Sequence, residues 1–240
     1  MRGKKGSLLI TAGFLFLISA GLLTGYNILD EKQAGQHAAK AVSQLETLIP
    51  AYVPQNSSTV QVNVQLPGLI SDSSQTVTMP LPDSAQAEPD EITQLPEFEI
   101  PDYILNPKME MPVIRLEDEE YIGWLEIPAL GLKLPVMSEW TYPRLKKSPC
   151  RYTGTAYQDN LVISAHNYER HFGRLKELDE GARIFFTDAD GNRFGYEVVL
   201  TETLKPTAIR DMTSGEFDLT LFTCTVGGRS RVTVRCEKVQ

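Results

Sequence analysis

The chain has 240 residues, of which 42% are hydrophobic and 22% charged, and its net charge is −8 at pH 7. This length allows one ordinary domain with appendages. The charge is uneven, because residues 53–107 hold eight acids and no Lys or Arg, whereas residues 108–240 hold 18 basic and 20 acidic residues. The C-terminal part lacks the basic footprint that nucleic-acid binding needs, so we expect no nucleic-acid partner.

An uncharged apolar run at residues 8–26 follows three basic residues near the N-terminus. It is long enough to span a bilayer as a helix. A cleaved signal peptide is the alternative, but the run is long for one and no clear cleavage site closes it. The positive-inside rule then predicts a single-pass protein of the cell membrane, with residues 1–7 in the cytoplasm and the C-terminal part outside the cell.

Residues 27–52 are rich in Ala, Gln, Glu and Lys, which predicts a membrane-proximal helix. We interpret His37 within it as a solvated helix residue. Residues 53–107 form a Pro-rich acidic linker, which we expect to be a disordered tether because it cannot bury enough apolar surface to fold. Within it, Val60–Leu66 alternates like a strand and allows a small β element.

Residues 108–240 are long enough to bury a sizeable core. Short runs with the period-two alternation or apolar content of strands are separated by turn signals, as at Asp188–Asn192. This pattern predicts a mainly β fold, a closed barrel of about 7–8 strands with short helices. One helix is expected inside the domain, at Phe172–Leu178. The expected strands are Tyr121–Ile127, Leu132–Val136, Leu161–Ala165, Arg183–Thr187, Arg193–Thr201, Leu219–Cys224 and Arg231–Glu237.

The stretch Leu219–Arg235 is predicted to be a β-hairpin with a Gly-Gly turn, which brings Cys224 and Arg231 to the same end of a sheet. A nearby cation favours a thiolate, and the guanidinium fork suits a developing oxyanion. On these residues alone, a buried structural cysteine beside an exposed arginine is an equal alternative. The chain has three cysteines, so at least one thiol is unpaired even if Cys150 and Cys236 form a disulfide. No Cys/His cluster indicates zinc.

His166 directly follows the predicted strand Leu161–Ala165. A histidine at the end of a strand, next to a loop, is well placed for acid–base chemistry. A satisfied structural histidine is the alternative. His171, five residues further on, is expected to lie on the surface.

Three segments together resemble the sortase family, the Gram-positive cell-surface transpeptidases. They are Tyr121–Val136 (YIGWLEIPALGLKLPV), Leu161–Leu178 (LVISAHNYERHFGRLKEL) and Leu219–Arg235, which carries a TLxTC-type signature in Thr220–Cys224. The resemblance covers about residues 121–237 and implies the sortase-type β-barrel. The segment after His166 looks like class B, but the segment between Val199 and Leu219 is short for that class, so the subclass stays open.

By this resemblance, Cys224 is the nucleophile, His166 the general acid and base, and Arg231 the residue that holds the substrate and the oxyanion. Thr223, just before the cysteine, is assigned to substrate binding. Arg229 and Arg235 are rival arginines. No metal or cofactor is implied, and the acidic run at 117–120 is interpreted as solvated charge rather than a calcium site.

The resemblance implies cleavage of an LPxTG-like sorting motif through a Cys thioacyl intermediate. The partners would be surface proteins with C-terminal sorting signals, and the acceptor an amine of a cell-wall precursor or of another protein. A membrane-anchored cysteine peptidase with water as the acceptor, or a non-catalytic surface binding module, are the alternatives that the sequence leaves open.

Overall fold

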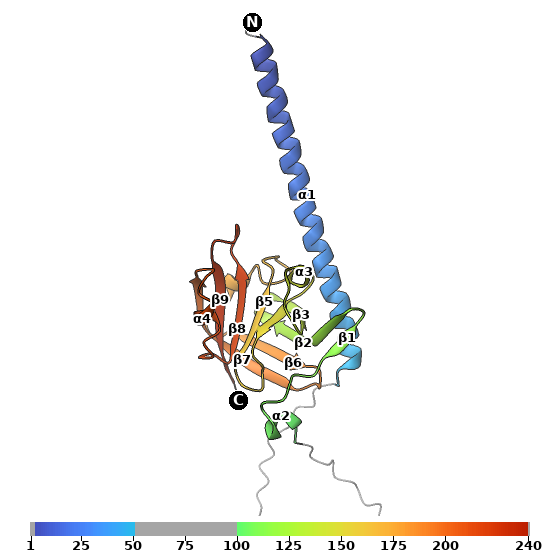
Figure 1. The fold of residues 1–240 in the computed structure, drawn as a ribbon, viewed down its shortest axis with the longest axis vertical. Helices are drawn as coiled ribbons and strands as arrows, with labels where there is room; N and C mark the ends of the chain where they lie inside the picture. Colours follow the sequence, from blue (N-terminus) through green and yellow to red (C-terminus); the bar gives the residue numbers. More distant parts are fainter. Residues whose placement is uncertain (1–2, 51–99, 240) are drawn as a thin grey trace, which may run out of the picture. The chain divides into compact units, whose positions relative to one another are not determined.

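The computed structural model describes residues 3–50 and 100–239, and within them the β-barrel predicted from the sequence is confirmed (Figure 1). Eight strands follow one another round a closed ring, because β6 pairs with both β7 and β2. A short strand, β1 (Ile114–Leu116), extends the sheet beside β2. In ring order the eight are β2 (Glu119–Ile127), β3 (Leu132–Met137), β4 (Cys150–Thr153), β5 (Leu161–Ala165), β8 (Leu219–Cys224), β9 (Arg231–Lys238), β7 (Arg193–Leu204) and β6 (Arg183–Asp188).

The alternation of apolar residues explains which side of each strand faces the barrel interior. On β7, Phe194, Tyr196 and Val198 are buried and the residues between them are only half-buried. β5 is apolar except for Ser164 and is buried along its whole length, and it pairs in parallel with the almost fully buried β8. Burial of successive residues is typical of strands that are covered on both faces.

The ring closes at Gly123, where β2 lies between β3 and β6. Gly123 has φ +140°, and a Cβ atom there would lie 1.9 Å from the carbonyl oxygen of Thr187 on β6. Only glycine combines this backbone conformation with such a close approach.

The prediction of a helix at Phe172–Leu178 was wrong, because only a single 3₁₀ turn forms, η2 (Leu175–Glu177). The first residues of that segment instead belong to a tight loop: a Cβ at Gly173 would lie 2.7 Å from the carbonyl oxygen of Asn167. The sequence analysis also missed β1, β4 and the other short helices. These are α2 (Asp102–Leu105), η1 (Pro128–Leu130), α3 (Tyr142–Leu145) and α4 (Ile209–Met212).

One continuous helix, α1 (Gly3–Leu48), contains the apolar run and the larger part of the helix expected at residues 27–52. Among the described residues it is the one helix long and apolar enough to cross a membrane. Its C-terminal part contacts β1, β2 and β3 (Figure 1). The buried residues recur every three or four positions, which is the spacing of one helix face. They are Ala34, Ala38, Ala41, Val42 and Leu45, continued by Ile49 just after the helix.

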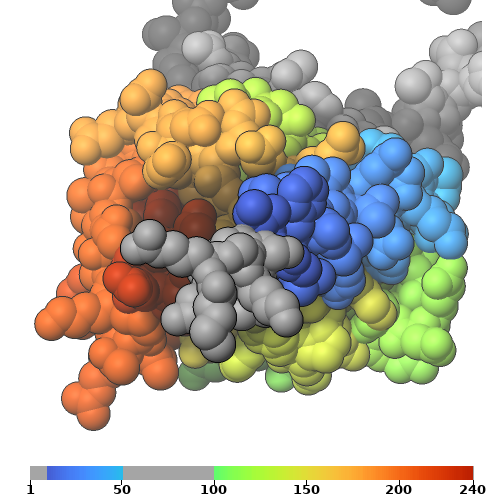
Figure 2. All heavy atoms as spheres, turned by 90° about the horizontal axis from the view of Figure 1, so that it is seen from above, coloured from blue at the N-terminus to red at the C-terminus, as the bar shows by residue number. Residues whose placement is uncertain are grey.

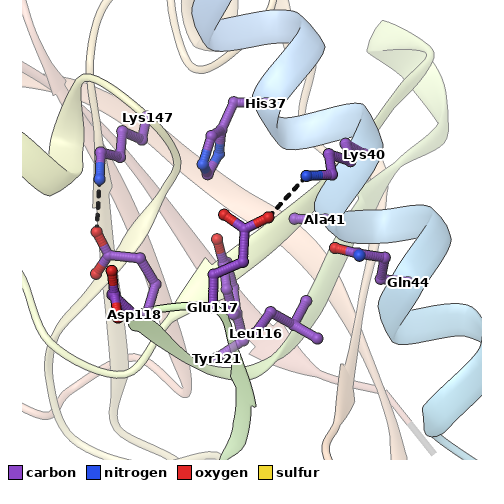
Figure 3. Close-up of a pocket in the computed structure, with 10 residues that line it drawn as sticks. His37, Lys40, Ala41, Gln44, Leu116, Glu117, Asp118, Tyr121 and Lys147 are labelled. Carbon is purple, nitrogen blue, oxygen red and sulfur yellow. Dashed lines mark hydrogen bonds and ion pairs between the residues drawn. The ribbon is translucent and has the colours of Figure 1, made fainter.

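Polar contacts flank this buried stripe (Figure 3). Lys40 Nζ donates to Glu117 at 2.7 Å, and Lys133 Nζ donates to Glu46 at 2.6 Å. His37 lies in a small cavity with Lys40 and Glu117, and its Nδ1 is buried without a hydrogen-bond partner. The interpretation of His37 as a solvated residue was therefore wrong, because the helix face that carries it packs against the barrel.

Of the acids at 117–120, Glu117 and Asp118 are exposed, as expected of solvated charge, whereas Glu119 and Glu120 are half-buried. Glu119 accepts hydrogen bonds from Arg144 at 2.8 Å and from Lys147 at 2.7 Å, and Glu120 pairs with Arg115. The strand considered at 60–66 and most of the predicted linker lie outside the described residues. Cys150, Cys224 and Cys236 are all free thiols, of which only Cys224 is exposed.

Candidate active site

Three neighbouring strands end side by side and carry the three residues singled out in the sequence. β5 and β8 run in parallel with Ala165 opposite Thr223, so the next residues, His166 and Cys224, leave the same end of both strands. Adjacent strands are about 5 Å apart. On its other side, Cys224 is directly opposite Arg231 of β9. The order across the sheet is therefore histidine, cysteine, arginine, with the exposed thiol in the middle.

The turn between β8 and β9 has the tight geometry that its glycines predict. Gly227 and Gly228 have φ of +79° and +70°, in the left-handed region that suits glycine. The loop is closed by Thr225 N donating to Ser230 O at 3.0 Å. Arg231 Nη1 donates to the carbonyls of Gly228 and Ser230 at 3.2 and 3.1 Å, which leaves other donors of its guanidinium for a ligand.

The two rival arginines have different surroundings. Arg235 is 3% exposed, and its guanidinium contacts Glu202 at 2.9 Å, Thr220 at 3.1 Å and the Asp211 carbonyl at 2.6 Å. All of these partners belong to the protein, so Arg235 has a structural role. Arg229 is exposed in the turn. Arg231 is the arginine that lies opposite the exposed thiol.

Thr223 connects two of the three strands. It is buried, and its hydroxyl donates to the carbonyl oxygen of Ala165 at 2.9 Å. This bond fixes the ends of β5 and β8 to each other just before His166 and Cys224.

A cavity of about 200 Å³ lies beside Cys224 and Arg231. Aromatic and aliphatic side chains form most of its wall, and Arg231 is the one charged residue that lines it. The apolar residues include Trp140, Tyr142, Tyr152, Ile209, Met212 and Phe222. They come from α3 and the loop before it, from α4, and from the strands β4 and β8, so segments distant in the sequence build this wall. The cavity is mostly apolar and lies next to the thiol, so it can bury apolar groups of a ligand.

His166 lines a second cavity on the other side of the row, between α1 and the loop that follows β5. Burial is the largest influence on the pKa of His166 and lowers it, and the charge of Lys146 lowers it further. The hydrogen bond with Asn167 and the charge of Asp30 raise this pKa in part. The net pKa lies below the ordinary value, so the neutral imidazole, the form that can accept a proton, is favoured at neutral pH.

The sequence analysis missed the residues that hold this imidazole. The Tyr168 ring stacks on His166 with ring centroids 4.2 Å apart, and the Tyr168 hydroxyl donates to the carboxylate of Asp30 on α1. His171, expected on the surface, is fully buried. That prediction was wrong because α1, which precedes His171 by over a hundred residues in sequence, packs over the loop. The Asn-Tyr pair after His166 was visible in the sequence, but nothing indicated that an acid near residue 30 would reach it.

This chain is similar to one known protein family and to several solved structures. A family model described as the Sortase domain matches residues 125–239. Solved structures similar to this chain include sortase A from Corynebacterium diphtheriae, with 23% identity, a TM-score of 0.46, and coverage of 51% of this chain and 62% of that one. Another is sortase C from Clostridium perfringens SM101, with 26% identity, a TM-score of 0.45, and coverage of 60% and 78%.

A third, sortase C1 of GBS pilus island 1, has 19% identity and a TM-score of 0.44, with coverage of 50% and 64%. The chain thus spans less than two thirds of the length of the C. diphtheriae and GBS proteins. A comparison with curated proteins finds no match. The matched residues run from within β2 to the end of β9 and include the whole row of strand ends. Residues 125–239 of this chain are therefore a sortase domain.

Proposed function

We propose that the chain is a membrane-anchored cysteine transpeptidase that cleaves a sorting motif of the LPxTG type and transfers the acyl part to an amine. The observation that carries the proposal is the row of strand ends, in which the exposed Cys224 lies between His166 and Arg231. A nucleophile with an acid–base group on one side and a fixed cation on the other has the parts that acyl transfer needs.

In the first step, the Cys224 thiolate attacks the scissile carbonyl and Arg231 stabilises the oxyanion. His166 acts here in its imidazolium form, which is the minor form at neutral pH, and protonates the leaving amine while the C–N bond breaks, which leaves a thioester and a neutral imidazole. Neither of the other cysteines can replace the nucleophile, because both are buried and burial raises the pKa of the Cys150 thiol to about 12.

The apolar cavity beside Cys224 suits a motif that contains leucine and proline. Its wall is aromatic and aliphatic, and its charged residue, Arg231, is next to the thiol. The proposed substrate-binding role of Thr223 would come from its backbone or methyl group, because its hydroxyl is bonded to Ala165.

Mass spectrometry of the full chain in detergent micelles tests the proposal. Incubation with LPxTG and NPxTN peptides should give a covalent adduct at Cys224, and Cys224→Ala should give none. Arg231→Gln should form the adduct at least tenfold more slowly, whereas Arg229→Gln, in the same turn, should react as the wild type does. A wild-type chain that forms no adduct with any peptide of the panel, while its exposed thiol is still alkylated, would favour a non-catalytic binding module.

A cysteine peptidase would form the same thioester and pass it to water. Addition of a primary amine separates the two activities, because a transpeptidase gives an amide product at the expense of the acid. Hydrolysis at the full rate, unaffected by the amine, would establish the peptidase.

The remaining parts of the proposal concern the cellular context. Residues 8–26 would span the membrane, with residues 1–7 in the cytoplasm and the sortase domain outside, and residues 53–107 would be the linker. The partners would be surface proteins with C-terminal sorting signals and an acceptor amine of a cell-wall precursor or of another protein. The segment after His166 resembles class B sortases, and membership of that subclass is a prediction.

A further inference from the structure

Two cavities flank the row of catalytic strand ends, and their walls differ in chemistry. The cavity beside Cys224 is mostly apolar. The cavity beside His166 has a volume of about 440 Å³ and a mostly polar wall. Tyr142 of α3 lines both cavities, so they adjoin at this residue. Figure 2 looks onto this end of the barrel, where α1, in blue, lies between segments coloured yellow to orange.

Residues of α1 build one side of the His166 cavity. They extend from Thr24, in the last turn of the proposed membrane span, to Glu31, and include two acids beyond that span, Asp30 and Glu31. Across from them are Lys146, Asn167 and Tyr168. With a neutral His166 the lining residues therefore carry two negative charges and one positive charge. The Cys224 cavity, lined by Arg231, has the opposite sign.

Both acids are held in position by the loop that carries the histidine. Asp30 accepts the Tyr168 hydroxyl, and Glu31 Oε1 accepts the backbone N–H of Glu169 at 2.8 Å. Tyr168 in turn stacks on His166. A carboxylate has more acceptor sites than one hydrogen bond uses, so each acid can still bind a cation. The imidazole and two fixed carboxylates thus meet at one cavity.

We propose that this cavity binds the acceptor amine of the transfer reaction as its ammonium ion, held by Asp30 and Glu31 of the anchor helix next to His166. The proposal rests on the proposed function, since it names the site of the second substrate. The first substrate occupies the apolar cavity, so the second must approach the thioester from another side, and the side on which His166 lies is the one with negative charge. A protonated amine is drawn to such a wall.

The bound ammonium releases one proton to solvent, and the neutral amine attacks the thioester carbon to form the new C–N bond. The second proton passes from the nitrogen to the neutral imidazole of His166. The C–S bond breaks and its electron pair leaves with Cys224 as the thiolate, which regenerates the thiolate and imidazolium for the next cycle.

The test uses the full chain in detergent micelles and measures the ratio of amide to acid product from one sorting peptide. Two acceptors are compared, glycinamide, which is mostly cationic at neutral pH, and hydroxylamine, which is mostly neutral. The variant is the double change Asp30→Asn and Glu31→Gln, which removes both charges and keeps an oxygen acceptor for Tyr168 and Glu169. Glu46→Gln is the matched control, because it removes an acid of α1 that pairs with Lys133 and does not line the cavity.

We expect the double variant to lower the amide-to-acid ratio with glycinamide roughly fivefold, through a higher KM for the amine, because charge pairs that are partly exposed to water contribute only modestly to binding. The ratio with hydroxylamine should not change, and Glu46→Gln should match the wild type with both acceptors. An unchanged glycinamide ratio would overturn the proposal. An equal loss with both acceptors would also overturn it, because the acids would then act by positioning the histidine loop. Failure of the wild type to form the Cys224 adduct is a separate result, which would refute the proposed function itself.

Discussion

The buried imidazole of His171 should make the folded chain sensitive to acid. The side chain is fully buried, and this burial is the main cause that lowers its pKa from 6.5 to about 4. The nearby His166 and His37 lower the pKa further, while the Ala34 backbone raises it, and the Tyr168 ring lies 5.5 Å away. Because folding depresses the pKa of His171, the stability that its neutral imidazole contributes is fully present above pH 6.5 and is lost as the pH falls toward 4.

The size of the effect follows from the two pKa values. The difference between 6.5 and about 4 corresponds to about 3 kcal/mol at 1.36 kcal/mol for each pH unit. Proton linkage places about 2 kcal/mol of this loss between pH 7 and pH 5, before most carboxylates titrate. That is a large fraction of the stability of an ordinary domain.

Urea unfolding of the full chain in detergent micelles measures this loss, with the fluorescence of the buried Trp124 as the signal. His171→Leu removes the titrating group and keeps an apolar side chain at the site. The free energy of unfolding of this variant should fall about 2 kcal/mol less than that of the wild type between pH 7 and pH 5. Equal losses in the two proteins would refute the reasoning. His166→Gln is the control for the neighbouring histidine of the same loop.

Three further predictions follow from burial and contacts. The exposed thiol of Cys224 should react quickly with iodoacetamide in the folded chain, whereas the buried Cys150 should react only on unfolding. Mass spectrometry measures the labelling, and fast labelling of the Cys224→Ala variant would contradict this prediction. Arg235→Met should lower the free energy of unfolding by about 3 kcal/mol, because it leaves Glu202 without its partner. Arg231→Met should reduce activity with little loss of stability. Equal losses of stability in the two variants would show that both arginines are structural. Leu45→Ala should cost about 2–5 kcal/mol in urea unfolding, and a negligible change would mean that α1 does not pack on the barrel.

The barrel and the row of strand ends could be predicted because their signals are local. The alternation in β7, the apolar run of β5 and the Gly-Gly turn after β8 each depend on a few consecutive residues. The relation between His166 and Cys224 could also be anticipated once both were placed at strand ends. The sequence does not show that β5 and β8 are parallel neighbours with Ala165 opposite Thr223, and it is this register that brings the two residues together.

The errors at His37 and His171 have a common physical cause, the long-range contact of α1 with the barrel. His37 and His171 are polar residues in polar stretches, so a local pattern assigns both to the surface. Their burial depends on a helix packing over a loop far away in the sequence. The same contact explains why Asp30 and Glu31, which look like the first charges after a membrane span, contact the histidine loop instead of water.

This contact also changes the role expected of the Pro-rich linker. Ile49, which lies before residues 53–107, is buried against the barrel, and Tyr103, near the C-terminal end of that range, stacks on Tyr157 with ring centroids 4.9 Å apart. The residues on both sides of 53–100 therefore belong to one compact unit. We therefore expect α1, and not the linker, to set the distance between the membrane and Cys224. Asp30 follows the predicted span by four residues, or about 6 Å of helix, so the active-site end of the barrel should lie close to the lipid surface. Removing half of the linker should leave the transfer rate in proteoliposomes unchanged, whereas a two-turn insertion after residue 26 should lower it for a membrane-anchored substrate and not for a free peptide. Sensitivity to the length of the linker, with no effect of the insertion, would show that the linker acts as the tether after all.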